Sequence, residues 1–319
     1  MSKSVLLLGG AGFIGSRIAR GLCEVGHKVV VIDGLMEDTG GNQRHIESIQ
    51  ADIKFVGAPI NEVKNIRQFI SAADYVIDCM AWTSHRLSMD RPSYDLALNA
   101  QSHLHVIEAL RSSEPRPVIY LGSRSQYGRA ATNPVTENTV QRPVDIQGIH
   151  KVAAESYYRI FSEIIGIPVV SLRICNVFGP NQPTVGEDIG LMGHIFRSCI
   201  LDQTVEIYRQ NGVRQVLYVD DLVEVVMRVA DVFRPGYSVY NVAGPNVNLV
   251  NVTQCAVEIL GSGHVKEVDM PIHIARMYSG DCILSTDEFV KDYGVIPEHD
   301  LVESIKKTLT YFKENIQQE

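Results

Sequence analysis

Three glycines near the start of the chain are the first residues with a clear chemical use. They are Gly9, Gly12 and Gly15, which follow a short apolar run at residues 5–8 and open a segment with helical spacing. Glycines allow a tight turn, let the backbone approach a pyrophosphate closely and let the helix pack near its strand. The free N–H groups at the start of that helix would bind phosphate oxygens. The spacing therefore predicts a dinucleotide-binding turn.

An acidic residue after the next apolar run supports this interpretation. Asp33 lies eighteen residues after Gly15 and directly follows the strand-like run at residues 28–32. A carboxylate at this place accepts hydrogen bonds from the adenosine ribose hydroxyls and repels a 2′-phosphate. Because no arginine follows at once, the pattern predicts NAD as the cofactor rather than NADP.

These residues need strands and helices to position them, and the front half of the chain alternates between the two. Strand-like runs cover residues 5–8, 28–32, 75–80, 118–121 and 169–174, and the main helical patterns cover residues 13–25, 94–110 and 149–165. Such alternation is typical of a parallel sheet with helices on both faces. We predict an α/β fold, a Rossmann-type doubly wound parallel sheet with a smaller C-terminal substrate lobe.

The pattern loosens after residue 177, where Pro180, Pro183 and Gly186 interrupt it, and strand character returns near residues 239–242. A chain of this length commonly forms a large domain and a smaller lobe. We assign an NAD-binding domain to residues 1–176 plus 215–245 and the substrate lobe to residues 177–214 plus 246–319.

The composition argues against several classes of protein. The formal net charge is −8 and no lysine- or arginine-rich run occurs, so nucleic acid is not an expected partner. Six scattered cysteines without a CxxC pair indicate reduced thiols and no metal site. The apolar run at residues 5–8 is too short for a signal peptide or a membrane span. We therefore expect a cytoplasmic protein that does not bind a membrane.

Beyond the glycine turn, six further segments carry motifs. They are Asp90-Arg91-Pro92 with Asn99, residues 120–128 around Ser123, residues 151–155 from Lys151, Arg173 with residues 176–180, Arg214 with residues 218–221, and residues 240–244. In this order they resemble the extended short-chain dehydrogenases/reductases, in the nucleotide-sugar epimerase/dehydratase branch. The resemblance runs along nearly the whole chain. It implies an NAD-dependent enzyme of polysaccharide biosynthesis whose smaller lobe binds a nucleotide sugar.

The resemblance also implies roles for single residues. Ser123 would hydrogen-bond the sugar hydroxyl that is oxidised, and Lys151 would bind the nicotinamide ribose and favour an anion beside it. Asn99 would hold the structure behind that lysine. The residues expected at the cofactor are Gly9, Gly12, Phe13, Ile14, Gly15, Asp33, Ala81, Asn99 and Lys151. Those expected at the substrate are Ser84, His85, Ser123, Asn176, Arg214 and Arg276, where arginines suit the paired oxygens of a diphosphate.

The sequence departs from the family at the catalytic position. The family carries a tyrosine four residues before its lysine, one helical turn away, which takes or gives the hydroxyl proton during hydride transfer. That position is Gln147 here, and no tyrosine in the chain is followed four residues later by a lysine. A glutamine amide is no general base near neutral pH, but it donates and accepts hydrogen bonds. Gln147 therefore stays in the expected catalytic set with Ser123 and Lys151.

Two further departures narrow the chemistry. Dehydratases of the family carry an aspartate–glutamate pair just after the catalytic serine or threonine, and Arg124 and Ser125 occupy those positions. A 4,6-dehydratase of the usual pattern is therefore disfavoured. Family members usually carry an acidic residue near the adenine at the position of Ala58. We therefore expect the contact between the protein and the adenine to be weaker here.

Histidines are the alternative sources of a general base, because they titrate near neutral pH. His85 follows the fourth strand, in a stretch that faces the substrate in the family, and His194 lies in the lobe. His150 is adjacent to Lys151 but points elsewhere, because helix neighbours diverge by about 100°. For each of the three, a packed or surface role is the more common one.

Several functions remain open at this point. The leading one is an NAD-dependent nucleotide-sugar epimerase or oxidoreductase, with a UDP-sugar as the expected substrate. The first alternative is a protein that binds NAD(H) and a nucleotide sugar with little turnover. The others are a reductase of a preformed keto-sugar and a 4,6-dehydratase with relocated acid/base groups. A homodimer is expected through the helices at residues 94–110 and 149–165.

Overall fold

A seven-stranded parallel sheet is the centre of the structure, a computed structural model that describes residues 2–186, 189–209, 213–272 and 282–316. Neighbouring strands follow the order β10-β6-β5-β4-β1-β2-β3, and every pair is parallel. The order reverses between β1 and β4, the place where doubly wound folds bind their ligands. The strands are β1 (Ser4–Leu8), β2 (Lys28–Asp33), β3 (Ile53–Gly57), β4 (Tyr75–Asp78), β5 (Val118–Ser123), β6 (Val169–Ile174) and β10 (Tyr237–Val242).

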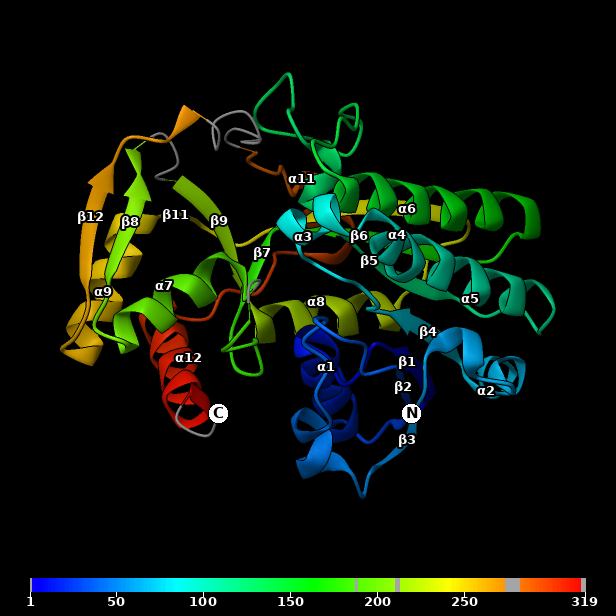
Figure 1. The fold of residues 1–319 in the computed structure, drawn as a ribbon. Coiled ribbons are helices and arrows are strands. Elements are labelled where there is room, and N and C mark those ends of the chain that lie inside the picture. Colours follow the sequence, from blue (N-terminus) through cyan, green and yellow to red (C-terminus); the bar gives the residue numbers. More distant parts are fainter. Residues whose placement is uncertain (1, 187–188, 210–212, 273–281, 317–319) are drawn as a thin grey trace.

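Helices cover both faces of this sheet, because successive strand residues point to opposite sides. In β1, Val5 and Leu7 lie in one hydrophobic cluster, and Leu6 and Leu8 lie in another. The first cluster is covered by α1 (Phe13–Glu24), η1 (Gln43–Ile49), α8 (Val219–Asp231) and α11 (Asp287–Tyr293). The second is covered by η2 (Ile60–Glu62), α2 (Ile66–Ala72), α5 (Ser102–Arg111) and α6 (Ile146–Ile165). The predicted Rossmann-type fold is confirmed (Figure 1).

A smaller lobe lies beside the sheet, on the left of Figure 1. Its strands form a three-stranded sheet in the order β11-β9-β7 and a two-stranded sheet of β12 and β8. A third hydrophobic cluster forms its core. The elements are β7 (Asn176–Phe178), α7 (Gly190–Ile200), β8 (Thr204–Tyr208), β9 (Val213–Tyr218), β11 (Asn246–Asn248), α9 (Leu249–Leu260), β12 (His264–Val268) and α12 (Leu301–Ile316). Within the described ranges, no helix has the length and apolar character needed to cross a membrane.

The division into two domains stays a prediction, and the structure adds one detail to it. The sequence assigns residues 246–319 to the lobe, but Cys282, Leu284 and Phe289 lie in the core cluster on one face of the large sheet. The ring of Phe289 packs edge-on against Tyr240 of β10, with centroids 6.0 Å apart. This segment returns to the sheet because the apolar face of the edge strand β10 needs a cover.

Two predicted helices differ in detail from the observed ones. The pattern at residues 94–110 follows α3 (His85–Asp90) and divides into α4 (Pro92–Leu96), the π-helical turn η3 (Ala97–Gln101) and α5. The helix predicted from residue 149 begins three residues earlier, as α6. Asp145 caps it, because its Oδ1 accepts a hydrogen bond from the Gly148 N–H at 2.7 Å. This cap brings Gln147 into the helix.

A buried carboxylate joins α6 to the sheet. Glu155 is 5% exposed, and its oxygens accept hydrogen bonds from Arg173 on β6, at 3.0 Å from Nε and 2.5 Å from Nη2. Gln126 donates to the same carboxylate at 2.9 Å, and its own Oε1 accepts from the Ser123 N–H at 2.8 Å. Burial raises the pKa of Glu155, but the Arg173 hydrogen bonds and charge outweigh it, so the pKa lies below its ordinary value.

Replacing this carboxylate should therefore destabilise the fold. We expect Glu155→Gln to lower the free energy of unfolding at pH 7 by about 3–5 kcal/mol, because Arg173 keeps a buried charge without its partner. Since the folded pKa is depressed, the contribution is present above the unfolded pKa and is lost as the pH falls through the folded pKa. The two proteins should thus converge only below the folded pKa of Glu155, as measured by urea unfolding from pH 7 down to about pH 2.

The matched control is Glu163→Gln, on the exposed end of the same helix. Glu163 pairs with Arg159 at 2.8 Å, and both side chains are about half exposed. This change should cost less than about 1 kcal/mol. Equal losses from the two variants would contradict the role given to Glu155.

Candidate functional site

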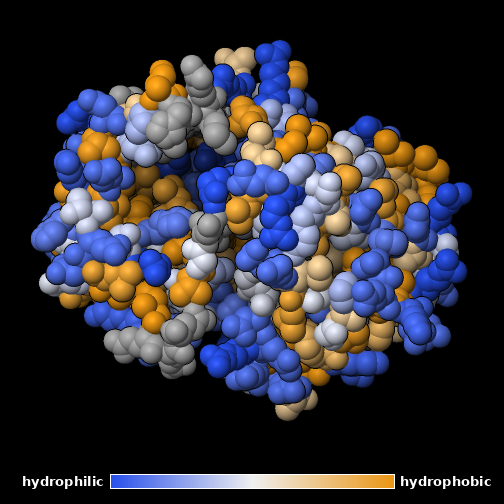
Figure 2. Space-filling view, viewed as in Figure 1, coloured by the Kyte–Doolittle hydropathy of each residue, from blue (hydrophilic) through white to orange (hydrophobic). Residues whose placement is uncertain are grey.

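A cavity of about 1430 Å³ opens between the carboxyl ends of the parallel strands and the lobe. Figure 2 shows the surface hollowed between these two parts. The walls include Gly12 after β1, Ala81 after β4 and Ser123 at the end of β5, while Arg214 comes from the lobe. Sites for one drug-sized ligand usually have about 300–1,000 Å³. The cavity therefore has room for two ligands side by side.

The glycine turn forms one wall of the cavity, together with Phe13 and Ile14. Gly9 has a φ of +73°, which favours glycine. A Cβ on Gly15 would lie 2.1 Å from the Gly9 carbonyl oxygen, so the packing of α1 on the turn requires glycine there. A Cβ on Gly12 would meet only that oxygen, at 3.4 Å. The fold thus leaves space beside Gly12 at the start of α1, as a bound pyrophosphate needs.

Asp33 lies at the end of β2 and borders the same cavity. Its Oδ2 accepts from the Ala11 N–H at 2.9 Å, and its Oδ1 accepts from the Leu35 N–H at 2.8 Å. Burial raises the pKa of this carboxyl, and the backbone hydrogen bonds oppose the rise. Each carboxylate oxygen has more than one acceptor site, so a fixed carboxylate next to the turn can still receive ribose hydroxyls. The residues present fit an NAD molecule.

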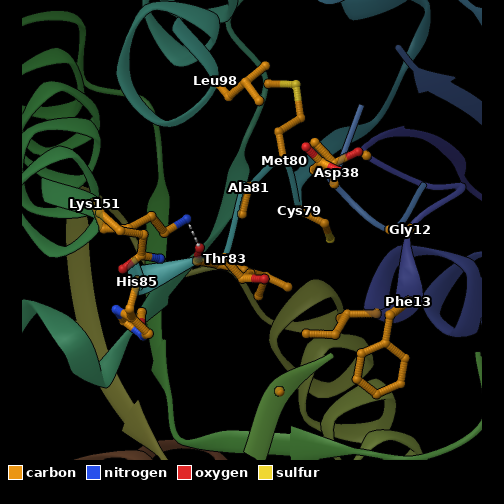
Figure 3. Close-up of a pocket in the computed structure, with 18 of the residues that line it drawn as sticks. Gly12, Phe13, Asp38, Cys79, Met80, Ala81, Thr83, His85, Leu98 and Lys151 are labelled. Carbon is orange, nitrogen blue, oxygen red and sulfur yellow. Dashed lines mark hydrogen bonds between the residues drawn. The ribbon is translucent and has the colours of Figure 1, made fainter. Parts of the chain in front are cut away.

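Lys151 and Ser123 border the cavity at its other end. The Nζ atom of Lys151 donates to the Leu121 carbonyl of β5 at 2.9 Å and lies 4.7 Å from the centre of the Tyr120 ring. Burial lowers the pKa of Lys151 to about 8, although Asp78 and other negative groups oppose the effect. The lysine is thus mostly charged at neutral pH. Figure 3 shows it across the cavity from Gly12 and Phe13.

Gln147 also borders the cavity, one helical turn before Lys151. It is 3% exposed. Its Oε1 accepts a hydrogen bond from the Ser125 hydroxyl at 2.9 Å, and its N–H donates to the Ser88 hydroxyl at 3.3 Å. This hydrogen bond fixes the position of the Gln147 amide. Neither the amide nor the hydroxyl gains or loses a proton readily near neutral pH. The pair therefore orders this part of the cavity wall, but neither residue can act as a general base.

Two expected ligand-binding residues do not border the cavity. Asn99 is completely buried and exchanges two hydrogen bonds with the backbone of Trp82, at 2.9 and 2.8 Å. Its amide also donates to Asp95 at 2.9 Å. Ser84 caps α3 by accepting from the Leu87 N–H at 3.2 Å. Both residues therefore shape the segment next to Ala81 rather than face a ligand.

The remaining expected residues come from the lobe side and from α3. Asn176 and Arg214 border the cavity, and Arg214 is 5% exposed with Nη1 donating to the Val213 carbonyl at 2.7 Å. Among the alternative histidines, His85 and His194 border the cavity, whereas His150 bonds to Asp95 at 2.5 Å. Arg276 lies outside the described residues.

The sequence analysis left many cavity residues out of the site, and three polar ones lie near Ser123 in the sequence or at the start of α6. Arg124 and Ser125 border the cavity, although the sequence analysis used them only to argue against a dehydratase. Asp145 was not singled out, and it borders the cavity as the cap of α6. An aspartate just before a helical pattern is a recognisable cap signal. That signal identifies a helix start but not the cavity beside it.

Two substitutions in the glycine turn should separate binding from folding. Gly12→Ala should unfold at the wild-type temperature but lose NAD affinity by at least about tenfold, because its methyl group occupies the space beside the pyrophosphate. Gly15→Ala should lower the unfolding temperature, because the packed backbone must move. Thermal unfolding and NAD titration of cofactor-free protein measure both effects. Wild-type affinity in Gly12→Ala would place the pyrophosphate elsewhere.

The chain is similar to known proteins along nearly its whole length. A UDP-glucose 4-epimerase of Mycolicibacterium smegmatis is 27% identical over 98% of this chain and 99% of its own length. Two solved structures share the fold. One is a UDP-glucose 4-epimerase of Thermotoga maritima with UDP-glucose (TM-score 0.85, 24% identity, 98% and 99% coverage). The other is the dTDP-glucose 4,6-dehydratase DesIV of Streptomyces venezuelae with NAD bound (TM-score 0.87, 20% identity, 99% and 98% coverage).

The family comparison confirms both the resemblance seen in the motifs and NAD as the expected cofactor. The matching family model is described as "NAD dependent epimerase/dehydratase family" and covers residues 5–243. This range extends from β1 through β10 and thus includes all of the seven-stranded sheet except Ser4. The chain belongs to the NAD-dependent epimerase/dehydratase family.

Proposed function

We propose that the protein is an NAD-dependent enzyme that oxidises a ring carbon of a UDP-sugar by hydride transfer, as an epimerase or an oxidoreductase. One observation supports this proposal above all others. A single cavity brings the glycine turn together with Ser123, Lys151 and the buried Arg214. A dinucleotide on the turn and a second anionic ligand near the arginine would meet in the middle of that cavity.

The nucleotide-sugar part of the proposal rests on charge and on the relatives. Arg214 is a buried cation that borders the cavity, and an arginine suits the paired oxygens of a diphosphate. Asn176 borders the cavity nearby, on β7, which pairs with β9. The similar structure from Thermotoga maritima contains UDP-glucose. A uridine diphosphate sugar is therefore the proposed substrate class.

Each of the cavity residues would have a separate role in this reaction. NAD would accept the hydride when bound. The Lys151 ammonium, held between β5 and α6, would bind the nicotinamide ribose and favour negative charge on the sugar oxygen. Ser123 would hydrogen-bond the sugar hydroxyl that is oxidised. Gln147, fixed by Ser125, would position the sugar but take no proton.

A second candidate is a protein that binds NAD(H) and a nucleotide sugar without turnover. The bond between Gln147 and Ser125 favours it, because the usual position of the base is filled by an amide that does not titrate. A 4,6-dehydratase is disfavoured, because Arg124 and Ser125 provide no carboxylate at the cavity wall.

The deciding experiment is a single-turnover measurement on the NAD-loaded protein. Each of a set of UDP-sugars is added in excess, NADH is followed by its absorbance, and the sugar products are identified by NMR. We expect transient NADH and an epimer, or stable NADH and a keto product. Arg214→Met should weaken UDP-sugar binding by about tenfold or more, because it removes the charged partner of the diphosphate.

The matched control for that variant is Arg228→Met on α8, whose side chain bonds to the Val295 carbonyl and to Glu224 at the surface. Binding by this control should equal wild type. Tight binding of a UDP-sugar with neither NADH nor product in the wild-type protein would support the binding protein and contradict the enzyme.

We also propose a homodimer formed through α5 and α6. Ile160 and Ile164 of α6 are 45% and 77% exposed, which leaves apolar surface that a second copy would cover. Ile164→Asp should give a monomer in sedimentation analysis, because a buried charge would oppose the contact. The control is Val232→Asp, at a 62% exposed position after α8. A monomeric wild-type protein would contradict the proposal.

A further inference from the structure

A histidine and an aspartate form a hydrogen-bonded pair at the cavity wall. Nδ1 of His85 lies 2.8 Å from Oδ2 of Asp145. His85 is the first residue of α3, and Asp145 is the cap of α6. Both residues border the cavity that holds Ser123 and Lys151. Figure 3 shows His85 on the same side of the cavity as Lys151.

The contacts of Asp145 favour its ionised state. Its side chain is 10% exposed, and its other oxygen accepts from the Gly148 N–H at 2.7 Å. Burial raises the pKa of Asp145, but the hydrogen bond and the charge of His85 outweigh it, so the pKa lies below its ordinary value. Asp145 is therefore ionised at neutral pH and can only accept hydrogen bonds.

An ionised partner also fixes the histidine tautomer. Because Asp145 only accepts, Nδ1 of His85 must carry the proton in this contact. The neutral ring then has its lone pair on Nε2, the nitrogen away from Asp145. The His85 side chain is 54% exposed, and the residue borders the cavity. An aspartate that orients an imidazole and stabilises its protonated form is the arrangement that a general base requires.

We propose that His85 and Asp145 are the acid/base pair of this site, with His85 as a catalytic residue and Asp145 as its positioning residue. This inference rests on the proposed function. When the sugar carbon is oxidised, its hydride passes to NAD⁺ and its hydroxyl proton passes to Nε2 of His85. A carbonyl group forms, NAD⁺ becomes NADH and the ring becomes an imidazolium. Reduction of the carbonyl returns the hydride and the same proton.

The other charged groups around His85 come from each element packed on α3. On α3 itself, Arg86 pairs with Asp90 at 3.4 Å. From α6, Asp145 contacts the ring directly, and Lys151 borders the same cavity. Between α4 and α6, Asp95 bonds to His150. Of these, Asp145 is the carboxylate in contact with His85, so its removal should have the largest effect on the titration of the ring.

Kinetics give the first test. In the wild-type protein the rate of NADH formation should rise with pH as His85 loses its proton, because only the neutral ring accepts the hydroxyl proton. His85→Gln keeps a donor for Asp145, and should lower this rate by about 10²–10⁴-fold and remove the rise. Asp145→Asn can still cap α6, and should shift the rise to lower pH because the protonated ring loses its stabilising charge.

The matched control is His299→Gln, which alters a second histidine–aspartate pair away from the cavity. Nδ1 of His299 lies 2.5 Å from Asp221 on α8, and neither residue borders the cavity. This variant should keep the wild-type rate and pH profile. Thermal unfolding of all the variants shows whether a lost rate reflects a lost fold.

Histidine NMR gives a second test that does not depend on turnover. The His85 ring signal, assigned by its absence in His85→Gln, should shift on addition of UDP-glucose but not of UDP, because only the sugar reaches the ring. An unchanged signal, or equal shifts with both ligands, would overturn the proposal.

The two proposals fail in different ways. If the wild-type protein forms NADH with a UDP-sugar and His85→Gln keeps both the rate and its pH dependence, the acid/base pair is overturned while the function stands. If the wild-type protein forms neither NADH nor product, the function itself is overturned, and the acid/base role is overturned with it.

Discussion

The carboxylate of Glu155 holds the site together, because it joins the three elements on which the site is built. It lies on α6, accepts two hydrogen bonds from Arg173 on β6, and accepts one from Gln126 in the turn after β5. The same Gln126 accepts the N–H of Ser123, and Lys151 lies one turn before Glu155 on the helix. The catalytic wall thus depends on a buried ion pair whose charges are compensated within the core.

The fold could be predicted from the sequence because its signals are local. Glycines at fixed spacing, an acid at a strand end and alternating apolar runs each reflect a steric or hydrophobic need of a few neighbouring residues. The packing at Gly15 shows the kind of constraint involved, since any side chain there would collide with the turn. The short strands β8 and β12 carry no comparable signal, because they pair with each other across 60 residues and lie partly exposed.

The site could be predicted only in part, because contacts between distant segments decide which polar residues reach the cavity. The sequence predicts that Asn99 and Ser84 contact a ligand, yet the side chains of both residues accept hydrogen bonds from nearby backbone N–H groups. Asp145 looks like a helix cap and is one, but it also meets His85, sixty positions earlier in the chain. A periodic pattern gives the face of a helix, and it does not give the partner that this face meets.

The pairing of β10 with β6 has a consequence for how the chain is made. Residues 237–242 complete the sheet next to residues 169–174, and Phe289 covers Tyr240 of β10 still later. During synthesis, β6 therefore leaves the ribosome long before the strand that will protect its edge. An apolar edge in that interval can pair with another nascent chain. Slow translation between these segments, or a lack of chaperones, would thus reduce the yield of protein before any ligand is involved.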